Sequence, residues 1–193
     1  SLSIDDLKIE LIFELPISNS IKLNFGPNTT HIEINGNGYM YTMNVVIMSS
    51  LNVDLHLYNI GIKAPDHPTN FGDSKNYAIY KSQGGLNLYT YQTVIIYGAM
   101  EGFNNMPIIV SPFEHIDVGH GIAAIGCSSL NIRHADALLI QGGSGGDGVD
   151  NTYSPHGGSG APGILVNSEV RIECDNVIIA GGIAGNGGDV LIG

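Results

Sequence analysis

Apolar and polar residues alternate along several short segments of the chain. Ile21, Leu23 and Phe25 are separated by polar residues, and a second alternating segment contains Ile32 and Ile34. Successive side chains of a strand point to opposite faces, so a period of two predicts strands rather than helices. Short apolar segments bordered by small or polar residues follow at 43–48, 76–81, 121–126 and 163–167. We therefore expect an all-β fold.

A longer motif repeats along the chain. SSLNIRHADALLIQGG at 128–143 aligns without a gap with GGLNLYTYQTVIIYGA at 84–99, which places Leu130 on Leu86. VRIECDNVIIAGG at 170–182 joins them when one residue is removed, and SSLNVDLHLYNIGIKA at 49–64 begins an earlier copy in which Leu51 is the equivalent position. Constant strand segments separated by variable loops are typical of a solenoid. Each repeat is predicted to hold three short strands.

Three strands per turn, stacked β-branched residues and corners of glycine or asparagine carry a resemblance to a known family. Residues 21–193 resemble the right-handed parallel β-helix, or pectin-lyase-like, superfamily, as in bacterial surface and secreted proteins. The resemblance implies one β-solenoid domain over residues 1–193, with long loops at one corner, as part of a longer protein. Export to the cell surface or the extracellular space is the matching expectation.

The two ends of the predicted solenoid differ in what could cover them. Residues 1–20 contain SIDDLKIELIFELP, in which Ser3 and Asp6 favour a short cap helix over the open end of the solenoid, although the segment also fits a first strand ending at Pro16. The few residues after Gly182 do not suffice for a cap. Further turns, or a second chain in end-to-end self-association, are therefore expected to cover that end.

Composition and charge narrow the partners. The chain has 193 residues, 27 glycines, 13% charged residues and a net charge of −11. Such a charge repels phosphate backbones and anionic lipid headgroups, so nucleic acid is not an expected partner. No apolar stretch reaches the roughly 18 to 20 residues that membrane insertion needs. Cys127 and Cys174 lie at non-equivalent positions of the repeat and are expected to be free, buried thiols.

The stretch QGGSGGDGVD at 141–150 matches several functional motifs. A dinucleotide-binding loop and a nucleophile elbow both require a following helix, and the next residues, NTYSPHGGSGAPG, cannot form one. The stretch also fits the calcium-binding β-roll nonapeptide from Gly142 to Asp150, and AGNGGDVLI at 184–192 fits with one departure, but the two matches are not in tandem. Two interpretations remain: corner glycines with positive φ before a solvated loop, or a Ca²⁺ site using Asp147 and Asp150.

Long insertions follow the third strand of successive repeats, so they are expected to leave the solenoid at one corner and to stack beside each other. They are predicted to occupy 63–75, 98–118 and 142–162. Acids, histidines and an aromatic residue in them suit glycan binding or contact with a host or cell-surface protein. The candidate ligand-binding residues are Asp66, His67, Glu114, His115, Asp117, Tyr153 and His156.

Tyrosines on the second repeat form another candidate surface. Alternation places Tyr89 and Tyr91 on one face of a strand, where they would either stack on sugar rings or pack against cross-strand neighbours. The other members of this group are Tyr77, Tyr80 and Tyr97.

An enzymatic alternative rests on a second resemblance. GHGIAAIG at 119–126 is similar to the G-H-G element of polygalacturonase-type hydrolases, and RIE at 171–173 is similar to their R-I-K. The resemblance implies His120 as the motif histidine and Arg171 as a substrate-binding arginine. However, Glu173 replaces the lysine, and the paired aspartates of that family are missing upstream, where inverting hydrolysis needs two carboxylates.

A non-enzymatic adhesin or spacer that binds glycans is the leading hypothesis. A polysaccharide hydrolase or lyase and a calcium-binding β-roll-like module are the alternatives. No cofactor other than Ca²⁺ is expected.

Overall fold

The computed structural model describes residues 6–10, 20–68, 77–99, 101–102, 121–147 and 157–186. These residues form an all-β structure without a helix. One ten-stranded sheet contains every strand except β6 (His67–Pro68) and β8 (Glu101–Gly102), which pair with each other. All the strand pairs in the described residues are parallel. The predicted all-β class and the parallel pairing are therefore confirmed, and the sheet is compatible with a solenoid.

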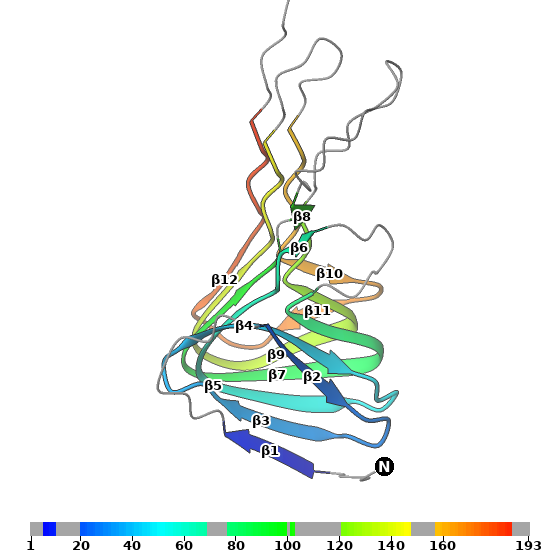
Figure 1. Cartoon of the computed structure of the whole chain (residues 1–193). Helices are drawn as coiled ribbons and strands as arrows, with labels where there is room; N and C mark the ends of the chain where they lie inside the picture. Colours follow the sequence, from blue (N-terminus) through cyan, green and yellow to red (C-terminus); the bar gives the residue numbers. More distant parts are fainter. Residues whose placement is uncertain are drawn as a thin grey trace, which may run out of the picture.

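The strand pairs form three parallel ladders, whose strands are arranged as in Figure 1. The chain passes through the first, second and third ladder in turn and then returns to the first. The first two turns use the strands β2 (Ile21–Phe25), β3 (His31–Asn35), β4 (Met40–Ile47) and β5 (Val53–Lys63). Each of the next two turns is one long bent strand, β7 (Ile79–Tyr97) and then β9 (Ile125–Gln141). The last described turn consists of β10 (Ile164–Val166), β11 (Val170–Ile172) and β12 (Val177–Ala180).

Equivalent positions of successive turns pair as the repeat predicts in most places. Leu86 pairs with Leu130, which pairs with Val170, and Ile96 pairs with Ile140. The earliest copy is different, because Val53 and not Leu51 lies opposite Leu86. Leu51 is 49% exposed, whereas Val53 is buried. The predicted equivalence of Leu51 is therefore wrong by two residues.

Inward-facing residues of the three ladders form one continuous core. Val45, Ile79 and Ile125 stand in one inner row of the first ladder, and each is fully buried. Leu55, Leu88 and Ile132 do the same in the second ladder. Because each apolar side chain contacts its equivalent one turn away, the core lengthens by one layer with every turn.

In several of the described turns, one residue with positive φ lies at the corner between the second and third ladder. Asn59 and Asn176 have φ values of 43° and 60°, and Gln92 has a φ of 60° at the corresponding place in β7. The left-handed region is strained for most side chains, but Asn tolerates it best after Gly. The predicted asparagine corners are thus present, and Gln92 is a member that the sequence pattern did not indicate.

The beginning of the described chain corrects one expectation. Residues Asp6–Glu10 form β1, which pairs in parallel with β3 from Asp6↔His31 to Glu10↔Asn35. The favoured cap helix is therefore wrong for these residues, and the alternative of a first strand holds. The alternation of Leu7 and Ile9 with charged residues suits a strand, and pairing with β3 supplies the backbone hydrogen bonds that a helix would have made internally.

The last described turn has one uncovered edge. Within the described residues, β10, β11 and β12 pair only with β9. Leu165, Val170, Ile172 and Ile178 are between 40% and 63% exposed there. End-to-end association at this edge stays a prediction. No helix in the described part of the chain is long and apolar enough to span a membrane.

Candidate binding surface

The outer face of the second ladder carries six aromatic and imidazole rings in mutual contact, which we call the ring array. Its members are His31, His56, Tyr58, Tyr89, Tyr91 and His134. They stand on β3, β5, β7 and β9, where inward positions are filled by buried Ile and Leu, so alternation directs these rings outward. All six side chains are half-buried. The array is therefore a surface that extends across four turns.

The rings stack along the direction in which the strands are stacked. His56 and Tyr89 have centroids 4.3 Å apart and an interplanar angle of 2°, and Tyr58 and Tyr91 have centroids 4.5 Å apart at 10°. His31 and His134 extend the array on either side, through tilted contacts with His56 and Tyr91. Offset or parallel stacking of this kind is worth about 0.5–1.5 kcal/mol per pair beyond the buried area. Cross-strand packing, one of the two alternatives for Tyr89 and Tyr91, is thus present.

Polar atoms line the edges of the ring array. The hydroxyl of Tyr91 lies 3.3 Å from Nδ1 of His56, and Nε2 of His31 lies 3.0 Å from a carboxylate oxygen of Glu33. Nε2 of His134 lies 3.2 Å from Oδ1 of Asp136. Burial, and then the neighbouring His31, lowers the pKa of His56 below its ordinary value. A neutral imidazole at this position can both donate and accept a hydrogen bond.

A column of amides runs beside the rings. Nδ2 of Asn131 donates to Oδ1 of Asn87 at 3.0 Å, and Nδ2 of Asn87 donates to Oδ1 of Asp54 at 2.7 Å. These residues pair directly in neighbouring strands, which brings the side chains into hydrogen-bonding distance. The outer face therefore offers ring edges, hydroxyls, imidazoles and amides on a regular grid.

The glycine-rich segments form a second surface, which we call the glycine bundle. It comprises 142–147, 157–162 and 181–186, which run side by side away from the ladders in Figure 1. Each segment is hydrogen-bonded to the other two through backbone N–H groups of residues three apart. The bonds are Gly142→Ala180, Gly145→Ile183, Gly158→Gly146, Ala161→Gly143, Gly182→Ala161 and Gly185→Gly158, at 2.7–3.0 Å between N and O. A repeat of three is that of an extended polyproline II helix, not of a strand.

Glycine is required in this bundle for close approach of backbones. A Cβ on Gly145 would overlap the carbonyl of Gly158, and one on Gly182 would overlap the carbonyl of Gly143. Among the described glycines only Gly38 and Gly84 have positive φ. The expected positive φ of the corner glycines is therefore wrong for Gly142, and so is the solvated-loop interpretation for 142–147, where the backbone is packed and bonded.

The predicted ligand-binding residues are mostly not placed. Glu114, His115, Asp117, His120, Asp150, Tyr153 and His156 lie outside the described residues. Asp66 accepts a hydrogen bond of 2.7 Å from Nζ of Lys63. The backbone of His67 pairs with Glu101 in the small sheet, so two of the insertions are adjacent where they leave the ladders. Arg171 is exposed, and its Nε lies 3.2 Å from a carboxylate oxygen of Glu169.

Of the two predicted calcium ligands, Asp147 stands in the glycine bundle and Asp150 lies outside the described residues. Oδ1 of Asp147 accepts hydrogen bonds from the backbone N and Nδ2 of Asn186, at 2.7 and 3.2 Å, and so ties two segments together. In the described part of the chain no group of three or more His, Cys, Asp and Glu side chains is arranged to hold a metal ion. The calcium site stays a prediction, since Asp150 is not placed.

The cysteines are both free. Cys127 is buried, and burial raises the pKa of its thiol to about 12, whereas Cys174 is only half-buried. The expectation of two free thiols is confirmed, and that of two buried ones is wrong for Cys174. Burial raises the pKa of the Cys174 thiol as well, so the protonated form is favoured at both positions.

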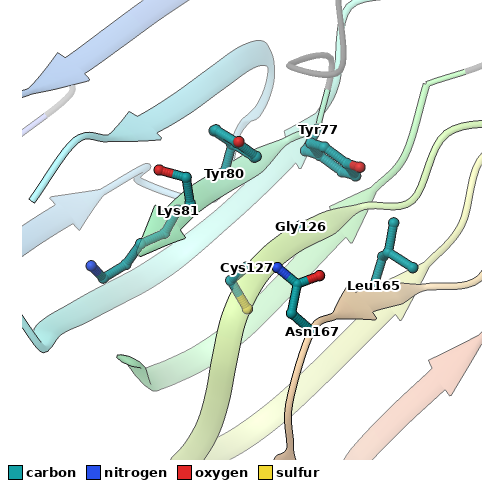
Figure 2. Close-up of a pocket in the computed structure, with 8 residues that line it drawn as sticks. Tyr77, Tyr80, Lys81, Gly126, Cys127, Leu165 and Asn167 are labelled. Atoms are coloured by element: carbon teal, nitrogen blue, oxygen red, sulfur yellow. The ribbon is translucent and has the colours of Figure 1, made fainter. Parts of the chain in front are cut away.

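A small cavity opens on the outer side of the first ladder (Figure 2). It has a volume of about 160 Å³. The cavity is lined by Tyr77, Tyr80, Lys81, Ser82, Gly126, Cys127, Leu165 and Asn167. Tyr77 and Tyr80 belong to the tyrosine group singled out from the sequence, and the structure places them here, apart from Tyr89 and Tyr91. Sequence reasoning missed the cavity because its walls come from three turns.

Comparison with known proteins gives no family for the chain. No protein-family model matches it, and no curated protein or solved structure matches it significantly.

Proposed function

We propose that the chain is a non-enzymatic module built on a right-handed parallel β-helix, in which the ring array binds glycans. The handedness is supported by the strong preference of parallel crossover connections for the right-handed form. The helical course is supported by three parallel ladders that the chain enters in a fixed order. In this proposal the module is a rigid spacer or adhesin of an exported surface protein.

The ring array is the observation that supports glycan binding. Its rings follow one another at about the 4.8 Å spacing of neighbouring strands, on the outer face of the second ladder. A polysaccharide is a long ligand with hydroxyls at regular intervals, and it meets ring C–H groups, Tyr hydroxyls, imidazoles and amides along such a face. Many shallow contacts of this kind suit binding of a polymer better than turnover of one bond.

A glycan array tests the proposal. Wild type is expected to bind one group of polysaccharides. The double variant Tyr58→Ala/Tyr91→Ala is expected to lose about tenfold in affinity, because two rings of the array are removed. Tyr39→Ala is the matched control, since Tyr39 is 44% exposed and contacts Tyr41 rather than the array. Binding that is equal in all three proteins would exclude the array.

A separate assay tests whether the module cleaves polysaccharides. Incubation with acidic polysaccharides, followed by measurement of reducing ends and of ultraviolet absorbance, detects hydrolysis and elimination. No product is expected. Turnover that disappears in His120→Ala would establish the polysaccharide-degrading alternative instead.

A further inference from the structure

The outer row of the first ladder is interrupted at Gly126. Register places Tyr80 on one side of this glycine and Leu165 on the other. Gly126 itself has no side chain to fill the middle of the row. The ring of Tyr77 covers part of this gap, and the cavity of about 160 Å³ opens beside it (Figure 2). The cavity is partly open to solvent, so it takes one small ring-sized group at most.

Tyr77 forms one wall of the gap. A Cβ built on Gly126 would lie 2.8 Å from three ring atoms of Tyr77, so this ring packs directly over the glycine. The ring is parallel to that of Tyr80, with centroids 5.5 Å apart and an interplanar angle of 9°. Nδ2 of Asn44 donates to the Tyr77 carbonyl at 2.8 Å and fixes the backbone there. The aromatic wall is thus held in place before any ligand arrives.

The remaining lining is neutral and more polar than apolar. Leu165 is 50% exposed, and Ser82 and Asn167 are exposed and add a hydroxyl and a carboxamide. Lys81 contributes no charge to the opening, because its ammonium group donates to backbone carbonyls on the inner side of the strand. An aromatic wall, an aliphatic wall and a few neutral polar groups fit a ring that has C–H faces and hydroxyl edges.

We propose that this cavity binds one uncharged pyranose ring of a saccharide, with the ring between Tyr77 and Leu165 and its hydroxyls on Asn167 and Ser82. The site lies on the first ladder and the ring array lies on the second, so the two are separate. The proposal adds a second site to the proposed glycan-binding function. It takes only the class of ligand from that function and does not require the ring array to bind.

Saturation-transfer NMR with a panel of methyl pyranosides, including N-acetylated ones, tests the site. Wild type is expected to transfer saturation to at least one member, with the strongest effect on C–H protons of one sugar face. Asn167→Ala and Tyr77→Ala are each expected to weaken this binding about tenfold. Asn24→Ala is the matched control, because Asn24 is an exposed asparagine in the same outer row, paired with Val46.

The outcomes separate the two sites. Transfer that is lost in Asn167→Ala and kept in Tyr58→Ala/Tyr91→Ala supports the cavity, whatever the glycan array shows for the ring array. Absence of transfer from every pyranoside, or transfer that is unchanged in Asn167→Ala, would overturn the proposal. Asn167→Ala decides the matter if Tyr77→Ala fails to fold, because the Asn167 side chain is exposed.

Discussion

The ammonium group of Lys81 lies 2.6 Å from the backbone carbonyl oxygen of Ser49, inside the core. Lys81 occupies an inward position between Ile47 and Cys127 and has no exposed surface. It also donates to the carbonyls of Leu51 and Gln83. These carbonyls belong to the corner between the first and second ladder in two successive turns, so one side chain holds both corners.

Replacement of Lys81 by methionine takes the donor from three carbonyls, of which that of Ser49 is buried, and this loss destabilises the folded protein. It also removes a buried charge, which offsets part of the loss. The net effect is expected to be a destabilisation of about 1–3 kcal/mol at pH 7. Chemical denaturation measures the difference. Lys22→Met, on the exposed side of β2, is the control and is expected to change stability by less than about 0.5 kcal/mol. Equal stability of the two variants would show that the corner carbonyls do not need Lys81.

The same lysine predicts a dependence on pH. Burial lowers the pKa of Lys81 from 10.5 to about 8. Between about pH 8 and 10.5 the unfolded chain holds the proton that the folded protein has lost, so the stability of wild type rises with pH relative to Lys81→Met. Tyrosines such as Tyr41, whose pKa is raised by burial, act equally in both proteins and cancel in the difference. A difference that is constant over this range would contradict the lowered pKa.

The glycine bundle predicts unequal effects of two neighbouring substitutions. A Cβ on Gly182 would overlap the backbone of Gly143, whereas a Cβ on Gly181 would have only the carbonyl of Ala161 nearby, at 3.6 Å. Gly182→Ala is therefore expected to cost about 1–3 kcal/mol and to speed hydrogen exchange of the bundle amides. Gly181→Ala is expected to be neutral or slightly stabilising. Equal effects of the two would mean that the segments are not in contact.

Much of this fold follows from the sequence, because the repeat and the alternation of side chains report directly on the ladders. The repeat predicted that Leu51 pairs with Leu86, but Val53 pairs with it. A shift of two residues keeps every apolar side chain on the inner face, so the hydrophobic pattern cannot detect it, although a shift of one would be obvious. The repeated Ser-Ser-Leu-Asn favoured the wrong register, whereas the structure pairs Val53 with Leu86.

The binding surfaces were less accessible to prediction. Tyr89 and Tyr91 were expected on one face, but their partners His31, His56 and His134 come from other turns, and only the register of those turns brings the rings together. The glycine bundle was missed for a related reason. A glycine needed for close approach looks the same in the sequence as one needed for positive φ, and the contacting backbone decides between them.

The left-handed corner at Gln92 allows a stabilising substitution. Gln92 has a φ of 60°, while the corresponding corners carry Asn59 and Asn176. Gln92→Gly is expected to raise stability by up to about 1 kcal/mol, because Gly removes the steric strain of this conformation, and Gln92→Asn is expected to give part of that gain. Thr93→Gly, at an exposed neighbour without positive φ, is the control and is expected to destabilise. A loss of stability in Gln92→Gly by urea denaturation would contradict the strained corner.

His56 is expected to control the stability of the ring array in mild acid. Burial and the neighbouring His31 lower the pKa of His56 in the folded protein. As the pH falls, His56 is therefore protonated in the unfolded chain before it is protonated in the folded protein. The stability associated with neutral His56 is therefore present above the ordinary pKa of about 6.5 and is lost as the pH falls through the lower folded value.

His56→Phe keeps a ring next to Tyr89 but cannot be protonated, so its stability is expected to fall less than that of wild type between about pH 6.5 and 5. Glycan binding provides a second readout, because protonation places a positive charge between stacked rings and makes both ring nitrogens of His56 donors. Parallel stability curves for wild type and His56→Phe over this range would show that His56 titrates as an ordinary surface histidine.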